Sequence, residues 1–300
     1  MSHYRITHTT SYHYSDMVSL CYNEARLIPR TFAGQSCLKY ELQIEPLPAD
    51  YQERLDFYGN KASYFSISTP HSVMSVTVQS EVLVHSSFDR AALEGTPTCS
   101  EVTKALFCAD SDPALIEPRS MMLESPYVPQ MSELASYGRE IFTPTKPFGV
   151  AVHELMEKIF REFRYTPGAT SIATPLREVF TKKIGVCQDF AQIAIGILRS
   201  LGYSARYVSG YLETVPLPGQ TKLIGSDASH AWFAAWIPGL GWVDFDPTNN
   251  TMPTGRHITC SWGRDYSDVI PLGGVIYGGG DHILKVSVDV HNLDTDKRGQ

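Results

Sequence analysis

The spacing of apolar residues changes along this chain, and that change is the strongest constraint on its fold. In the first third, apolar and polar residues alternate, as in residues 38–44 and 76–84. A period of two is typical of strands that bury one face. The dipeptide Gly59-Asn60 lies between two aromatic pairs and predicts a hairpin turn. We therefore expect residues 1–95 to form an antiparallel β sandwich or barrel.

Helical spacing takes over in the middle of the chain. Residues 152–163 carry one apolar stripe, and residues 187–201 carry another that ends at Gly202, a typical helix stop. Strand-like segments then follow at 205–212, 230–237, 242–245 and 284–290. This order predicts an α+β fold in which a helix packs on an antiparallel sheet.

These patterns divide the chain into four segments. After the β domain, residues 96–145 are interrupted by six prolines and predict a connector with one short helix near 132–142. Residues 146–255 predict the core of helix and sheet. Residues 256–300 predict a C-terminal β segment.

Charge and hydropathy exclude several classes of function. The chain has 25 Lys and Arg against 32 Asp and Glu, so no basic excess exists to release counterions from a nucleic acid. No apolar run has the length of a membrane span, and the first residues lack the pattern of a signal peptide. We expect a cytoplasmic globular protein without nucleic-acid or membrane partners. The sequence leaves the oligomeric state open.

The six cysteines argue against a structural zinc site and against a disulfide framework. No two of them form a Cys-x-x-Cys pair, and a chain of 300 residues can bury its own core without cross-links. No His-Glu-x-x-His motif is present either, which argues against a metal hydrolase. We expect no metal and no cofactor. Five of the cysteines are interpreted as small apolar residues, mostly in the core; they are Cys21, Cys37, Cys99, Cys108 and Cys260.

Cys187 differs from the other five because it stands where a helix is predicted to begin. The unpaired N–H groups and the positive dipole end at a helix N-terminus favour a thiolate. Cys187 is therefore a candidate nucleophile, and a nucleophilic thiolate needs a base and a group that orients the base.

His230 is the candidate base, because it opens the predicted strand 230–237 just before a second strand that ends near Asp246. Residues two apart in a strand share a face, so a hairpin loop with an odd number of residues puts His230 and Asp246 on the same side. With three loop residues, Asp246 lies nearer the imidazole than Asp244, which is the secondary candidate. An even loop would separate the pair. The other histidines, His257 among them, are interpreted as surface or local hydrogen-bonding residues.

Three short sequence motifs around these residues resemble those of the transglutaminase-like superfamily of cysteine enzymes. They are Gly-Val-Cys-Gln-Asp-Phe-Ala at Cys187, Ser-His-Ala-Trp at His230, and Gly-Trp-Val-Asp-Phe-Asp-Pro-Thr at Asp246. The resemblance covers about residues 150–250, and it implies a papain-like, transglutaminase-like core with Cys187, His230 and Asp246 on the family's triad positions. Residues 22–30 and 263–268 are similar to segments that flank this core in bacterial members.

The expected activity is acyl transfer on a peptide or carboxamide bond of a peptide or protein substrate. Cys187 would attack the carbonyl, and His230, held by Asp246, would protonate the leaving amine. Backbone N–H groups at the helix start, with that of Gln188 among them, would hold the oxyanion, and Trp232 would wall the cleft. Release by water would make a protease or amidase, and release by an amine would make a transglutaminase. The alternative is a non-catalytic peptide-binding or scaffold protein that keeps the fold.

Overall fold

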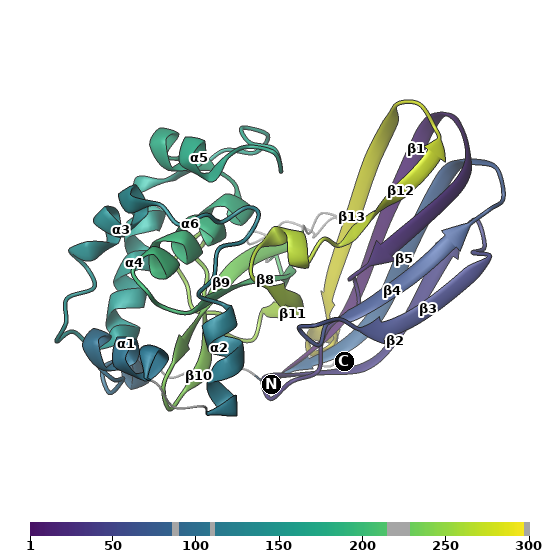
Figure 1. The fold of residues 1–300 in the computed structure, drawn as a ribbon. Coiled ribbons are helices and arrows are strands. Elements are labelled where there is room, and N and C mark those ends of the chain that lie inside the picture. The colour runs from purple at the N-terminus through teal and green to yellow at the C-terminus, as the bar shows by residue number, and fades with distance from the viewer. Residues whose placement is uncertain (86–89, 109–111, 215–228, 297–300) are drawn as a thin grey trace, which may run out of the picture.

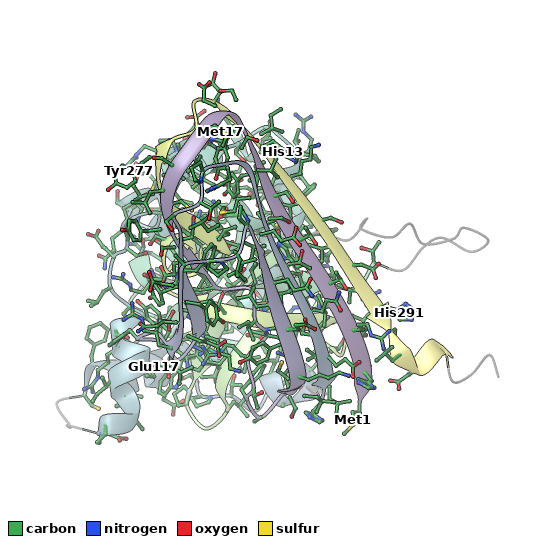
Figure 2. The ribbon with its side chains drawn as sticks, turned by 90° about the vertical axis from the view of Figure 1, so that its right-hand side faces the viewer. Met1, His13, Met17, Glu117, Tyr277 and His291 are labelled. Atoms are coloured by element: carbon green, nitrogen blue, oxygen red, sulfur yellow. The ribbon has the colours of Figure 1, made fainter. Side chains whose placement is uncertain are left out.

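One long strand, β1 (Ser2–Ala25), organises the first sheet of the protein. The computed structural model describes residues 1–85, 90–108, 112–214 and 229–296. Every second side chain of β1 is buried from Tyr4 to Thr10, as the alternating pattern predicts. The strand bends near Met17, and its pairing with β5 (His71–Val84) shifts register between His13 and Val18 (Figure 2).

The strands beside β1 form one antiparallel sheet in the order β2-β5-β1-β4-β3, and β12 and β13 pair with the opposite edge of β1. Their bounds are β2 (Gln35–Glu45), β3 (Asp50–Leu55), β4 (Lys61–Ile67), β12 (Leu272–Gly278) and β13 (His282–Asn292). Because the sheet bends with β1, its two halves face each other (Figure 1). Val76 of β5 accordingly shares a buried cluster with Phe65 and Ile67 of β4. The predicted sandwich or barrel is thus one sheet folded over on itself.

Residues 256–300 do not act as one C-terminal segment, in contrast to the sequence-based division. The strand β11 (His257–Gly263) pairs with β8 (Ala205–Leu212) in a second sheet, whereas β12 and β13 return to β1. The alternation in 284–290 correctly predicted a strand, but periodicity does not identify a strand's partner. The open N–H and C=O groups along β1 supply that partner.

The second sheet has the order β10-β9-β8-β11, and one helix, α6 (Cys187–Ser200), packs on β8 and β9. The other strands of this half are β6 (Arg164–Tyr165), β7 (Ile184–Gly185), β9 (Ser229–Ile237) and β10 (Gly241–Phe245). The other helices are α1 (Cys99–Phe107), α2 (Ile116–Ser120), α3 (Ser132–Arg139), α4 (Phe148–Glu162), α5 (Leu176–Lys182) and α7 (Leu293–Asp296), with 3-10 turns at Arg90–Leu93, Pro113–Leu115 and Tyr266–Asp268. Within the described residues, every helix is too short or too polar to cross a bilayer. The α+β class is confirmed.

The predicted connector belongs to the helical layer. Val102 and Leu106 of α1 and Leu134 of α3 lie in the same buried cluster as the apolar faces of α4 and α6. The segment is therefore ordered by burial of these side chains. Its many prolines interrupt the helical spacing, so the sequence pattern did not predict these helices.

The two sheets meet through an apolar interface and a pair of backbone-like hydrogen bonds. Val288 of β13 packs in one cluster with Tyr211 of β8 and Ile258 of β11. The side-chain amide of Gln35 donates to the Thr259 carbonyl at 2.8 Å and accepts the Thr259 N–H at 2.8 Å. Gln35 at the start of β2 therefore joins the N-terminal sheet to the backbone of β11.

Candidate active site

Cys187 is the first residue of α6, at the helix start that the sequence predicts. Its side chain is half-buried and its thiol is free, as are those of the other five cysteines. Among those five, Cys21, Cys99 and Cys260 are buried, in agreement with a packing role. The position of Cys187 combines a helix N-terminus with partial access to solvent, which suits a reactive thiol.

Asp189 fixes the start of α6 from within its first turn. Its carboxylate accepts the Val186 N–H at 2.8 Å and the Thr170 hydroxyl at 2.6 Å. Burial raises the pKa of Asp189, and these two hydrogen bonds oppose the rise. Asp189 takes the Val186 N–H, so the N–H groups of Cys187, Gln188 and Asp189 remain at this helix end without an intrahelical acceptor.

The hairpin of β9 and β10 has the odd loop that the sequence argument required. Ile237 pairs with Gly241, so three residues form the loop, and the register continues to Phe233 and Phe245. His230 Nε2 lies 2.7 Å from Asp246 Oδ2. Asp246 is fully buried, and the side chain of His230 is 10% exposed.

The loop after β10 positions the Asp246 carboxylate. Its Oδ1 accepts the backbone N–H groups of Thr248 at 3.0 Å and Asn249 at 3.3 Å. Its Oδ2 also accepts the side-chain amide of Asn249 at 2.7 Å. The sequence reasoning missed Asn249, although an Asp-Pro-Thr-Asn word that ends a strand is a turn signal.

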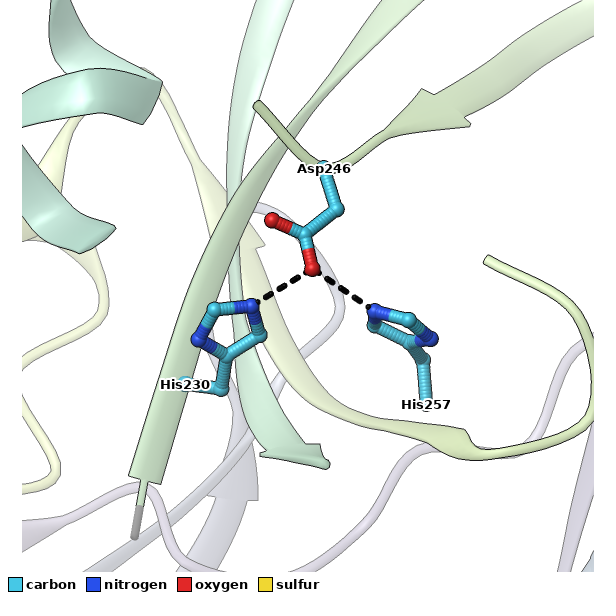
Figure 3. Close-up of side chains that lie close together, drawn as sticks. All are labelled: His230, Asp246 and His257. Carbon is cyan, nitrogen blue, oxygen red and sulfur yellow. Dashed lines mark hydrogen bonds and ion pairs between the residues drawn. The ribbon is translucent and has the colours of Figure 1, made fainter. Parts of the chain in front are cut away.

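His257 is the second residue that the sequence reasoning missed. This side chain is 7% exposed, and its Nε2 lies 3.0 Å from the same oxygen, Asp246 Oδ2 (Figure 3). The interpretation of His257 as a surface or purely local residue is therefore wrong. Its proximity to Asp246 depends on the pairing of β11 with β8, which no local pattern reveals.

Charge and burial compete in this group. Burial lowers the pKa of His230, but the hydrogen bond to the Asp246 carboxylate and the adjacent Cys187 sulfur raise it to about 10. Burial raises the pKa of Asp246, but hydrogen bonds from His230 and His257 hold it below its ordinary range. The imidazolium of His230 and the carboxylate of Asp246 are therefore the favoured forms at neutral pH.

This pair predicts how stability depends on pH. Because the pKa of His230 rises from 6.5 to about 10 on folding, its contribution is complete below pH 6.5 and is lost as the pH approaches 10. The difference in unfolding free energy between wild type and His230→Gln should therefore shrink over that window. Urea unfolding of both proteins at pH 6.5, 8 and 9.5 measures this difference, and a constant difference would contradict the prediction.

The remaining sequence candidates occupy different places. Gln188 is half-buried beside Cys187. Trp232 is fully buried and packs edge-on to His257, with ring centroids 5.2 Å apart. It therefore supports the histidines from inside the protein and does not line a solvent-accessible cleft. Asp244 does not contact His230 in the described hydrogen bonds. Burial raises its pKa against the attraction of the Arg206 charge.

Tyr165 is a further residue beside the thiol that the sequence did not indicate. It lies on β6, which pairs with Gly185 of β7 just before α6, and its side chain is 49% exposed. Burial and the nearby charge of Cys187 raise its pKa.

His230, Asp246 and His257 are also the described residues whose donor atoms converge closely enough to surround a metal ion. Their N···O separations of 2.7 and 3.0 Å are those of hydrogen bonds. Both Nε2–H protons would have to leave before the nitrogens could bind a cation. As it stands, the arrangement is a network of proton donors around one carboxylate.

Comparisons with known proteins cover both halves of the chain. A family model described as the transglutaminase-like superfamily matches residues 135–247, and one described as the bacterial transglutaminase-like N-terminal region matches residues 4–83. An uncharacterized protein of Mycobacterium tuberculosis is 37% identical over 298 residues, covering 98% of this chain and 94% of the relative. A protein-glutamine gamma-glutamyltransferase of Pseudomonas aeruginosa is 29% identical over 137 residues, covering 42% of this chain and 20% of that protein.

A solved structure has the same fold over nearly the whole chain. It is a protein of Cytophaga hutchinsonii described as a candidate cysteine protease, with a TM-score of 0.75 and 20% identity. The match covers 98% of this chain and 92% of that one.

Proposed function

Because this chain belongs to the transglutaminase-like superfamily, we propose that it is a cysteine enzyme that transfers acyl groups from peptide or carboxamide bonds. Cys187 is the nucleophile, His230 the proton carrier and Asp246 the group that orients His230. One observation carries the proposal: His230 donates to buried Asp246 at 2.7 Å while the Cys187 sulfur lies beside the same ring.

The protonation states fit such a reaction. With Nε2–H donated to Asp246, the other nitrogen of His230 takes the proton of the Cys187 thiol, and this transfer gives the imidazolium that is favoured at neutral pH together with the thiolate. The thiolate then attacks the carbonyl carbon and forms a C–S bond, and the backbone N–H groups of Cys187 and Gln188 hold the oxyanion. His230 gives its proton to the leaving nitrogen, the C–N bond breaks, and a thioester with Cys187 results.

The thioester is then attacked by water or by an amine, and His230 takes the proton of the attacking group. The C–S bond breaks, the acyl product leaves, and the Cys187 thiolate is restored beside the imidazolium of His230. Water gives a protease or amidase, and an amine gives a transglutaminase. Both releases use the same three side chains, so the acceptor is an outcome to be measured. A thiolate nucleophile must stay reduced, and all six cysteines are free, which fits a cytoplasmic location. The proposed substrate is a peptide or protein, because the proposed reaction cleaves a peptide or carboxamide bond.

The test is reactivity of Cys187 followed by turnover. Iodoacetamide at pH 7 should label Cys187 at least tenfold faster than Cys108, which is also half-buried but begins no helix, and His230→Ala should slow that labelling. Peptide mapping by mass spectrometry measures the rates.

Cys187→Ala should abolish release of amine from peptide and glutamine-amide substrates, with and without an added amine acceptor. Cys108→Ala is the matched control and should keep wild-type turnover. Equal labelling of both cysteines, together with no turnover that depends on Cys187, would favour a binding or scaffold protein instead.

A further inference from the structure

Asp246 Oδ2 accepts hydrogen bonds from two imidazoles, which approach from different strands. His230 comes from β9 and His257 from β11, with Nε2···Oδ2 distances of 2.7 and 3.0 Å (Figure 3). The proposed reaction uses the first imidazole and leaves the second without a role. Burying a second titratable ring against the same carboxylate costs desolvation, so a role for it must be sought.

The backbone around His257 brings it to this position. His257 opens β11, and β11 runs beside β8, where Gly210 faces His230 on β9. A Cβ at Gly210 would collide with the carbonyl of Ile258 and with the ring of Trp232. Only glycine lets β11 approach so closely, and this approach carries His257 to within hydrogen-bond distance of Asp246.

The hydrogen-bond partners of His257 favour one tautomer. Nε2 faces the carboxylate, while Nδ1 is buried and has no hydrogen-bond partner among the described residues. A proton on Nδ1 would be a buried donor without an acceptor, whereas a bare Nδ1 costs less. A proton on Nε2 therefore satisfies the carboxylate.

We propose that His257 is a positioning residue whose Nε2–H fixes the Asp246 carboxylate so that Oδ2 points at His230. This inference rests on the proposed function and adds a fourth side chain to it. With His257 present, Oδ2 accepts from the β11 side as well as from Asn249, and Oδ1 accepts two backbone N–H groups. Rotation of the carboxylate therefore breaks four hydrogen bonds besides the one to His230, and the one from His257 is the only one of the four that comes from β11. His230 then keeps the tautomer and orientation that the thiol needs.

Two variants separate hydrogen-bond donation from packing. His257→Phe keeps a ring of similar size and donates nothing, whereas His257→Gln places an amide N–H near the position of Nε2 and lacks the ring. In the Phe variant, iodoacetamide should label Cys187 at least about tenfold more slowly than in wild type, and substrate turnover should fall by a similar factor. In the Gln variant, both rates should lie within a few fold of the wild-type rates. A thermal melt of each variant checks folding, and His257→Leu replaces the Phe variant if that one does not fold.

The reverse order would overturn the inference. If the Phe variant matches wild type, or if Phe and Gln slow alkylation equally, His257 acts by packing against Trp232. Alkylation is read without turnover, so failure of the proposed function appears separately, as activity that survives Cys187→Ala.

Discussion

Asp246→Asn should slow alkylation of Cys187 and any acyl transfer by about 10²–10⁴-fold, one of the two largest effects that this structure predicts. The carboxylate accepts from His230, His257 and Asn249, and an amide cannot accept from all three. When its NH₂ group faces His230 Nε2, that nitrogen must accept, so the proton moves to the nitrogen that faces the thiol. A base that already carries its proton there cannot take another from Cys187.

Asp244→Asn is the matched control, because it makes the same chemical change two residues away on the same hairpin. Asp244 pairs across to Ala234, is near the charges of Arg206 and His257, and makes no hydrogen bond to His230 among the described residues. This variant should keep the alkylation rate within about threefold of wild type. The assignment of Asp246 is contradicted if the two variants are equally slow while both proteins are folded by circular dichroism.

Arg199→Met should produce the largest loss of stability, about 3–5 kcal/mol of unfolding free energy. Arg199 lies near the end of α6 and is 2% exposed. Its guanidinium donates to the carbonyl of Ala205 at 2.9 Å, the carbonyl of Arg264 at 2.7 Å and the hydroxyl of Ser125 at 3.1 Å. Burial lowers the pKa of Arg199 to about 10, so the group still carries its charge at pH 7.

The cost arises because methionine fills the volume and leaves these acceptors buried without a donor. The attraction between the charges of Arg199 and Asp265 is also lost. Arg177→Met is the control, since Arg177 pairs with Glu133 on the surface and such pairs contribute less than about 1 kcal/mol. Urea unfolding monitored by tryptophan fluorescence compares the two, and equal losses would contradict the structural role of Arg199.

Local patterns in the sequence predicted much of the site's framework. The apolar stripe and Gly202 placed the helix that begins at Cys187, and loop parity selected Asp246 over Asp244. Both inferences depend only on helix and strand geometry over short stretches of chain. That is why they could be made before the partners of each strand were known.

The missed features depend on contacts between distant segments. His257 reaches Asp246 only because β11 pairs with β8, and Gly210 allows that approach. The return of β12 and β13 to β1 likewise could not be predicted from alternation, which marks a strand but not its neighbour. Trp232 was expected to line the cleft because strand periodicity predicts the face of the sheet on which a side chain lies. Whether that side chain is buried depends on the elements that cover the face, which periodicity does not predict.

The pairing of β13 with β1 also sets the order in which the molecule can be assembled. Arg5 pairs with His291, whereas the partners within the second sheet are much closer in the sequence. Closing such a long loop has a higher entropic cost than closing the pairs β8–β9 and β9–β10 of the second sheet. During synthesis, this edge of β1 stays open until residues 272–292 emerge, so its N–H and C=O groups are available for pairing with another chain until then.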